Sequence, residues 1–211
     1  MNSLRASGLH LWRGELHVLR GIDFEVRAGQ CLQVTGANGA GKTTLLRVLC
    51  GLLPIEAGQI EWCQRPVGLD WLAYRGQLAW ASHHGGLKGD LTPLENLVTH
   101  GRIAGAGGAE PLPARARACL ERAALPAECH ARPVRQLSAG QQRRVTLARL
   151  LLLARPLWLL DEPVSNLDAE GQSLVSELLR AHLAGGGLAV AATHQALQLD
   201  AGQCRPLELH A

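Results

Sequence analysis

The fold class of this chain is decided by one stretch of its sequence, TGANGAGKTT at residues 35–44. The stretch contains the pattern Gly-x4-Gly-Lys-Thr, in which glycines let backbone N–H groups converge on phosphate oxygens. In such a loop Lys42 is expected to reach the outer phosphates, and Thr43 to ligate Mg²⁺. Only two lysines occur in the chain, Lys42 and Lys88, so abundance does not explain Lys42. The alternative is a Gly-rich turn before an ordinary helix, and each further motif weakens it.

The residues on either side of this stretch provide the context that a phosphate-binding loop needs. Apolar residues alternate in 22–26 and again in 32–34, which indicates two strands with Ala28-Gly29 as the turn between them. The apolar residues of 45–49 have helical spacing, and Gly51 follows them. The sequence therefore predicts a strand, a loop and a helix in this order.

The later part of the chain alternates strands and helices. Short strands are expected at residues 59–63 and 78–82, and buried strands at 156–161 and 188–193. A helix expected at 169–184 joins the last two strands, which makes a βαβ crossover in a parallel sheet. The sequence thus predicts an α/β fold.

The middle of the chain has its own signals. Thr92-Pro93 is expected to begin a helix, because Pro suits the first helical turn. The small and flexible residues of 103–113 predict a surface loop. About 17 residues follow His194, which leaves no room for an added regulatory domain, so one domain is expected over residues 1–211.

Composition excludes several classes of protein. The chain has 211 residues and a net charge of +3, and its arginines are spread along the sequence rather than gathered into a nucleic-acid-binding patch. The six cysteines show no metal-ligand spacing and the N-terminus has no signal-peptide pattern, so a cytosolic protein with reduced thiols is expected. The longest apolar run, 150–154, is far shorter than the roughly 20 residues of a membrane span.

Two further motifs carry chemistry. A buried strand ends in Asp161-Glu162, which offers one carboxylate to hold Mg²⁺ and another to polarise an attacking water molecule. Ser138 precedes a long helix, so its hydroxyl and the next N–H groups form a second anion-binding helix terminus. Each has a structural alternative, a solvated strand end and an ordinary capped helix.

With Thr193-His194 after the last strand, these motifs stand in the order found in the ABC ATPases, and the chain resembles that family over essentially its whole length. The resemblance implies an ATP-hydrolysing enzyme with the P-loop NTPase fold of ABC type. That fold has a mostly parallel core sheet, an N-terminal antiparallel β subdomain and a helical subdomain. Residues 1–82 and 155–211 are expected to form the first two, and residues 83–154 the helical subdomain with the signature motif.

The resemblance also implies a set of site residues in a head-to-tail dimer, in which each ATP lies between the P-loop of one subunit and the signature of the other. Lys42, Glu162 and His194 are implied as catalytic, and Asp168 as coupling the two sites. Thr43, Asp161 and His83 are implied as contacts of Mg²⁺. Trp12 would stack on adenine, unless it only packs in its strand. The residues implied in ATP binding are Trp12, Gly36, Ala37, Asn38, Gly39, Ala40, Gly41, Lys42, Thr43, Thr44, Ser138, Gly140 and Gln141.

Two positions depart from the family pattern. Ala139 replaces the commoner glycine of the signature turn, which is tolerated if its φ stays negative. His83 stands where the family usually has a Gln, and a neutral imidazole can make a similar hydrogen bond with a pH dependence near its ordinary pKa of about 6.5. An alternative takes His83-His84 as haem or metal ligands, but adjacent histidines do not easily face one metal.

The segments HHGGLK and LSAGQQRRVTLARL, at residues 83–88 and 137–150, resemble those of the cytochrome c maturation protein A family. This resemblance implies an ATP-binding subunit of the haem exporter, held by integral membrane subunits at the cytoplasmic face of the bacterial inner membrane. It implies neither haem nor nucleic acid bound by this subunit. The alternatives are another small bacterial ABC transporter subunit and a soluble ABC ATPase that acts on ribosomes or DNA.

Overall fold

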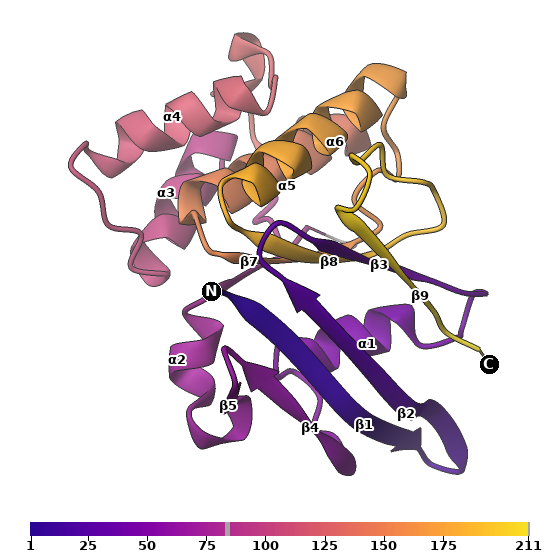
Figure 1. Cartoon of the computed structure of the whole chain (residues 1–211). Helices are drawn as coiled ribbons and strands as arrows, with labels where there is room; N and C mark the ends of the chain where they lie inside the picture. Colours follow the sequence, from indigo (N-terminus) through magenta and orange to yellow (C-terminus); the bar gives the residue numbers. More distant parts are fainter. Residues whose placement is uncertain (83–84, 211) are drawn as a thin grey trace.

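The computed structural model describes residues 1–82 and 85–210. It contains a parallel sheet and an antiparallel sheet, with helices on both faces of the parallel sheet (Figure 1). The parallel sheet has the order β6 (Leu78–Ala81), β7 (Leu157–Asp161), β8 (Leu188–Ala192), β3 (Cys31–Thr35) and β9 (Cys204–Glu208). The antiparallel sheet has the order β2 (Leu16–Arg27), β1 (Ser3–Arg13), β4 (Ala57–Trp62) and β5 (Arg65–Pro66).

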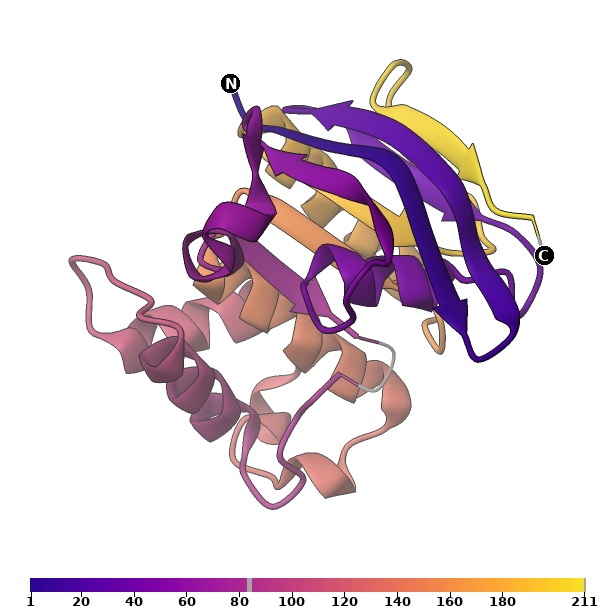
Figure 2. The same cartoon turned by 90° about the horizontal axis from the view of Figure 1, so that it is seen from below.

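The helices are distributed unevenly around these sheets. Helix α1 lies on the face of the parallel sheet that also faces the antiparallel sheet, and α5 and α6 cover the opposite face (Figure 1). Helices α3 and α4 lie to one side, away from the antiparallel sheet (Figure 2). The helices are α1 (Lys42–Leu49), α2 (Trp71–Arg75), α3 (Pro93–Ile103), α4 (Leu112–Arg122), α5 (Ala139–Leu153) and α6 (Ala169–Ala184), with short 3₁₀ turns at Val67–Leu69, Ala127–Cys129 and Val134–Gln136.

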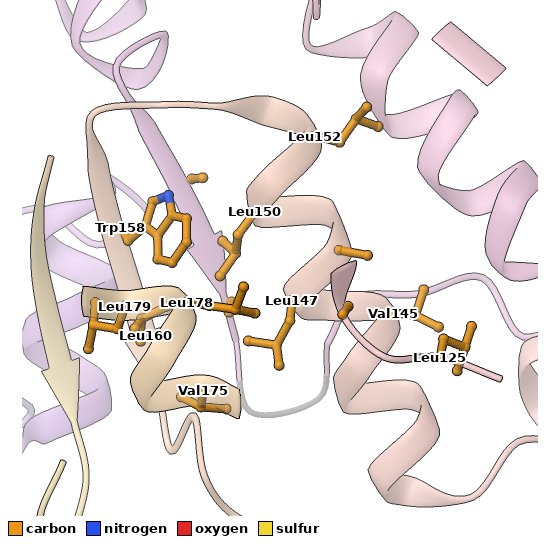
Figure 3. Close-up of a cluster of buried hydrophobic side chains, with 14 of the residues drawn as sticks. Leu125, Val145, Leu147, Leu150, Leu152, Trp158, Leu160, Val175, Leu178 and Leu179 are labelled. Atoms are coloured by element: carbon orange, nitrogen blue, oxygen red, sulfur yellow. The ribbon is translucent and has the colours of Figure 1, made fainter. Parts of the chain in front are cut away.

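The core is built on alternation along the buried strands. In β7, Leu157 and Leu159 pack in the cluster on the α1 side, whereas Trp158 and Leu160 pack against α5 and α6 (Figure 3). Every residue of β7 and β8 is buried, as expected for parallel strands covered on both faces. The carboxyl end of β7 is therefore held rigidly, and this end carries Asp161.

Local signals in the sequence account for several element boundaries. Thr92 caps α3 with a complete capping box, in which its hydroxyl accepts from Glu95 N–H and the Glu95 carboxylate accepts from Thr92 N–H. Helix α6 spans the expected residues 169–184. The expected loop at 103–113 is shorter, because α3 ends at Ile103 and α4 already begins at Leu112.

The expected strands shift by one or two residues at their ends. The strand expected at 59–63 is β4 (Ala57–Trp62), which ends where Cys63 and Gln64 turn with positive φ values of 51° and 65°. None of the helices in residues 1–82 and 85–210 combines the length with the apolar composition that a membrane span requires.

Candidate nucleotide-binding site

The loop between β3 and α1 has the backbone of a phosphate cradle. Gly41 is the N-cap of α1 with φ of 100°, and Gly36 has φ of 137°. A Cβ at Gly36 would lie 2.4 Å from the carbonyl oxygen of Leu209, so only glycine fits there. No side chain of the described residues caps α1, so the positive end of this helix faces the loop without a side-chain acceptor of its own.

Lys42 is held inside this loop. Its side chain is 9% exposed, and Nζ donates to the carbonyl oxygens of Gly36 at 2.8 Å and Ala37 at 3.0 Å. These bonds keep the ammonium group at the mouth of the cradle. Because an ammonium group has three donors, it can also contact a phosphate oxygen, or exchange a carbonyl for one.

Thr43 and Asp161 form the second polar contact of the site. The hydroxyl of Thr43 donates to Asp161 Oδ1 at 3.0 Å, across 118 positions of sequence. Asp161 is 2% exposed at the end of β7. Mg²⁺ prefers oxygen ligands such as a hydroxyl and a carboxylate. It is usually held by one or two such protein ligands together with substrate phosphates. This pair therefore fits a Mg²⁺ ion bound with a nucleotide.

Glu162 and His194 line the same cavity as the loop. His194 Nε2 lies 3.5 Å from Glu162 Oε1. Glu162 has a left-handed backbone with φ of 49°, which is uncommon for a residue with a side chain, and its N–H donates to the carbonyl oxygen of Ala192 at 2.8 Å. The pair therefore presents a carboxylate and an imidazole side by side at the cavity of the loop.

One open cavity of about 360 Å³, a size typical of small-molecule sites, is lined by residues of the loop together with Glu162 and His194. One wall holds polar groups of the loop and the Glu162–His194 pair. Residues from the end of β1 and the start of β2 complete the lining. The lining residues are Arg13, Leu16, Val18, Asn38, Gly39, Gly41, Lys42, Thr43, Thr44, Glu162 and His194.

The cavity residues from β1 and β2 differ from Trp12, the residue that the family resemblance implied on this strand. Arg13, Leu16 and Val18 line the cavity, whereas Trp12 is not among its lining residues in the described part of the chain. The Trp12 ring is 40% exposed and stacks on His17, with ring centroids 3.8 Å apart and an angle of 7° between the rings. The stacking of Trp12 on adenine remains a prediction.

The signature residues lie in a different cavity. Ser138 caps α5, with its Oγ accepting from Gln141 N–H at 3.2 Å, while Gln141 Oε1 accepts from Ser138 N–H at 2.9 Å. Ser138, Gly140 and Gln141 line an open cavity of about 610 Å³ with Asp168, apart from the cavity of the phosphate loop. Within one chain, the two predicted halves of the ATP site therefore do not meet.

Ala139 and Asp168 have ordinary structural roles as well. Ala139 opens α5 and is absent from the described non-glycine residues with positive φ, so the condition for replacing glycine there is met. Asp168 caps α6 by accepting from Gly171 N–H at 2.9 Å. His83 and His84 lie outside the described residues. Within residues 1–82 and 85–210, no group of three or more His, Cys, Asp or Glu side chains could hold a metal ion.

Comparison with known proteins places this chain in a family. The ABC transporter family matches residues 19–165. The chain is 41% identical to the cytochrome c biogenesis ATP-binding export protein CcmA of Dechloromonas aromatica, covering 98% of this chain and 99% of that protein. It is 43% identical to the CcmA protein of Methylococcus capsulatus, with 98% and 97% covered.

Two solved structures have the same fold. The ATP-binding subunit of an ABC transporter superposes with a TM-score of 0.85 at 25% identity, covering 98% of this chain and 85% of that one. A dimeric bacterial ABC transporter cassette superposes with a TM-score of 0.82 at 24% identity, covering 97% and 94%. The expected fold, a P-loop NTPase of ABC type with a parallel and an antiparallel sheet, is thus confirmed.

Proposed function

The chain belongs to the ABC transporter family of ATP-binding proteins, and from this premise we propose that it is the ATP-hydrolysing subunit of the haem exporter of c-type cytochrome biogenesis. Similarity at 41% and 43% identity to CcmA proteins over nearly the full chain supports this proposal. Neither alternative, another small ABC transporter or a soluble ABC ATPase on ribosomes or DNA, is favoured by these relatives. The chain would sit at the cytoplasmic face of the inner membrane, held by integral membrane subunits.

One observation carries the proposal for the site. A single cavity joins the phosphate loop with Glu162 and His194, while Ser138 lines another cavity of the same chain. A second copy in head-to-tail orientation would bring its Ser138, Gly140 and Gln141 to the ATP held by Lys42. Such a dimer supplies donors that one chain alone cannot bring to its own phosphates. Asp168 lines the signature cavity and would lie near the junction of the two copies.

The residues then divide the chemistry among them. Backbone N–H groups from residues 36–44 and the Lys42 ammonium bind the β- and γ-phosphates. Thr43 and Asp161 would hold Mg²⁺, which neutralises charge on the phosphate oxygens when it is bound with ATP. The oxygen of a water molecule attacks the γ-phosphorus while the bond to the β–γ bridging oxygen breaks. Glu162 accepts a proton of that water, and His194 contacts the γ-phosphate beside it.

The division into subdomains follows the same proposal. Residues 1–82 and 155–211 contain every strand of both described sheets, and residues 83–154 contain α3, α4 and α5. The signature at the start of α5 thereby belongs to the helical part, and the phosphate loop to the part with the sheets. Movement of one part against the other would open and close the ATP sandwich.

The test replaces one atom of the proposed base. In a strain that lacks this protein, the wild-type chain and Glu162→Gln are expressed, and haem covalently bound to c-type cytochromes is measured by in-gel peroxidase staining. Because general-base catalysis contributes about 10²- to 10⁴-fold, ATP hydrolysis by Glu162→Gln should fall by about that factor and the cytochromes should disappear. The exposed Glu177→Gln is the matched control and should behave as wild type.

Three other results would contradict the proposed function. Normal cytochromes despite lost ATP hydrolysis would reject the haem-exporter role and favour another transporter. Salt-dependent binding of nucleic acid by the purified chain would instead favour an ATPase that acts on ribosomes or DNA. Unchanged ATP hydrolysis in Glu162→Gln would remove Glu162 from the role of base.

A further inference from the structure

Arg143 is a buried cation that the proposed mechanism does not use. It lies in α5, five residues after Ser138, and is 6% exposed. Within the described part of the chain it forms no ion pair with a carboxylate, and the hydrogen bonds of its guanidinium go to main-chain carbonyls and one hydroxyl. A buried arginine without a carboxylate partner is costly, so its position calls for a reason other than stability.

The partners of Arg143 converge on the residue proposed as the base. Nη2 donates to the carbonyl oxygen of Glu162 at 2.7 Å and to Ser165 Oγ at 3.0 Å. The Ser165 hydroxyl donates to the same Glu162 carbonyl at 2.9 Å, which closes a triangle of hydrogen bonds. Nη1 reaches the carbonyl oxygen of Ser82, just beyond β6, at 3.3 Å. One side chain of α5 thus binds the ends of two neighbouring strands.

The backbone of Glu162 needs such support. A non-glycine residue in the left-handed region costs about 1–2 kcal/mol, and it persists only where its surroundings hold it. The Glu162 N–H is held by Ala192, and its carbonyl receives Arg143 together with the hydroxyl and N–H of Ser165. This backbone directs the Glu162 carboxylate toward His194 and the cavity of the phosphate loop.

We propose that Arg143 is a positioning residue, which holds Glu162 in its left-handed turn and so couples the start of the signature helix to the base. Arg143 acts through Glu162, because it does not line the cavity of the phosphate loop among the described residues. A shift of α5, caused by ATP contacting Ser138 from the other subunit, would reach the Glu162 carbonyl through one side chain. The inference rests on the proposed role of Glu162 as the base.

The energetics separate positioning from stability. Burial lowers the pKa of Arg143 below its ordinary value, while the nearby carboxylates of Asp161 and Glu162 partly oppose this effect. Arg143→Met removes the cost of burying this charge, but it also leaves the carbonyl oxygens of Ser82 and Glu162 with one donor fewer, so stability should fall modestly. Arg143→Met should therefore slow catalysis by more than this loss of stability explains, and a second buried arginine of the same helix controls for the stability effect.

The matched control is Arg149, which lies on the same helix and is also 6% exposed. Burial lowers the pKa of Arg149 to about 10, and its Nη2 donates to the carbonyl oxygen of Trp80 at 3.1 Å. It has no hydrogen bond to Glu162 in the described structure. Arg149→Met removes a buried charge from the same helix without touching the proposed support of the base.

The experiment measures steady-state ATP hydrolysis and thermal unfolding of the full chain assembled with its membrane subunits. For Arg143→Met we expect kcat to fall about 10- to 100-fold, part of the range of general-base catalysis, with KM for ATP within about threefold of wild type. Arg143→Lys, which keeps a cationic donor group but loses the planar fork of the guanidinium, should recover part of kcat. Arg149→Met should keep kcat within about twofold.

A second comparison makes the test specific for the base. In a Glu162→Gln background, Arg143→Met should cause no further loss, because the group that it positions is already inactive. An unchanged kcat in Arg143→Met, or equal losses of kcat and melting temperature in both arginine variants, overturns the inference. If Glu162→Gln itself hydrolyses ATP normally, the proposed role of Glu162 fails instead, so the two failures are distinct.

Discussion

The N-termini of α1 and α5 differ in whether a side chain caps them. Helix α1 begins at Lys42 behind Gly41, whose φ is 100°, and no side chain of the described residues caps it. Helix α5 begins behind Ser138 with a complete capping box, in which Ser138 and Gln141 satisfy each other. Both termini carry partial positive charge and donor N–H groups.

The difference indicates how each terminus can bind an anion. At α1 the end of the helix is open to a phosphate, and among the described residues Lys42 Nζ donates only to carbonyls of its own loop. At α5 a phosphate oxygen that takes the Gln141 N–H must displace the Ser138 hydroxyl, so an internal hydrogen bond is exchanged rather than gained. We infer that ATP binds first at the phosphate loop, and that the signature contributes when a second subunit closes over it.

The largest expected effect removes the cation from the open terminus. Lys42→Met keeps the length of the side chain but eliminates the donors that face the phosphates. Removing one preorganised donor to developing charge costs about 10²- to 10³-fold, so ATP hydrolysis should fall by at least that factor. A radiolabelled-ATP hydrolysis assay checks this expectation.

The control is the other lysine of the chain. Lys88 is exposed, and Lys88→Met should hydrolyse ATP at the wild-type rate. Full activity in Lys42→Met would show that the open helix end binds phosphate without help from Lys42. Equal losses in both variants would instead indicate a general effect of reduced charge.

The parts of the fold with local signals were predictable from the sequence. The phosphate loop was predicted between a strand and a helix, and β3 and α1 flank it. The Thr92 cap and the helix at 169–184 were predicted because capping residues and apolar periodicity act within a few positions. Strand β9 (Cys204–Glu208) was missed, because its residues are mostly polar or partly exposed at the sheet edge.

Contacts across long stretches of sequence were not predictable. Arg143 and Glu162 are 19 positions apart in the sequence and meet because α5 packs on the sheet. No local sequence pattern predicts this contact. On the β1–β2 hairpin, the pairing register shifts between Leu11 and Trp12. Because a shift of one residue moves a side chain to the opposite face, the hairpin places Arg13 rather than Trp12 at the cavity.

An intermediate effect tests whether the capped terminus acts in another subunit. In a Glu162→Gln background, which should retain ATP, a Lys42→Met chain is mixed with a Ser138→Arg chain. If each site takes Lys42 from one subunit and Ser138 from the other, the mixed dimer has one intact site and one site that lacks both. We expect each variant alone to trap no ATP, and the mixture to trap one ATP per mixed dimer.

The stoichiometry decides the geometry. Bound nucleotide is counted after gel filtration of differently tagged chains, purified sequentially through both tags. If Lys42 and Ser138 served the same site from one chain, both sites of the mixed dimer would be defective and no ATP would be retained. That result would contradict the head-to-tail arrangement and leave the two helix starts as independent features.

The smallest expected effect concerns the part of the open cavity that β1 and β2 line. Arg13 lines the cavity with Leu16 and Val18, and a guanidinium can stack on the face of an aromatic base. Such a contact at an exposed site is worth about 0.5–1 kcal/mol, so Arg13→Ala should raise the Kd for ATP about two- to fivefold in calorimetric titrations. Inorganic tripolyphosphate, which has no base, should bind both chains equally.

Comparison with Trp12→Ala shows which residue contacts the adenine of ATP. The Trp12 ring is already stacked on His17, with ring centroids 3.8 Å apart, so its loss should change the Kd for ATP less than the loss of Arg13 does. If Trp12→Ala weakened ATP binding more than Arg13→Ala does, adenine would stack on Trp12. The Trp12 ring would then have to leave His17 when ATP binds. If Arg13→Ala weakened the binding of ATP and of tripolyphosphate equally, Arg13 would contact the phosphates instead of adenine. Arg13 would then be a second cation, after Lys42, that binds phosphate near the start of α1.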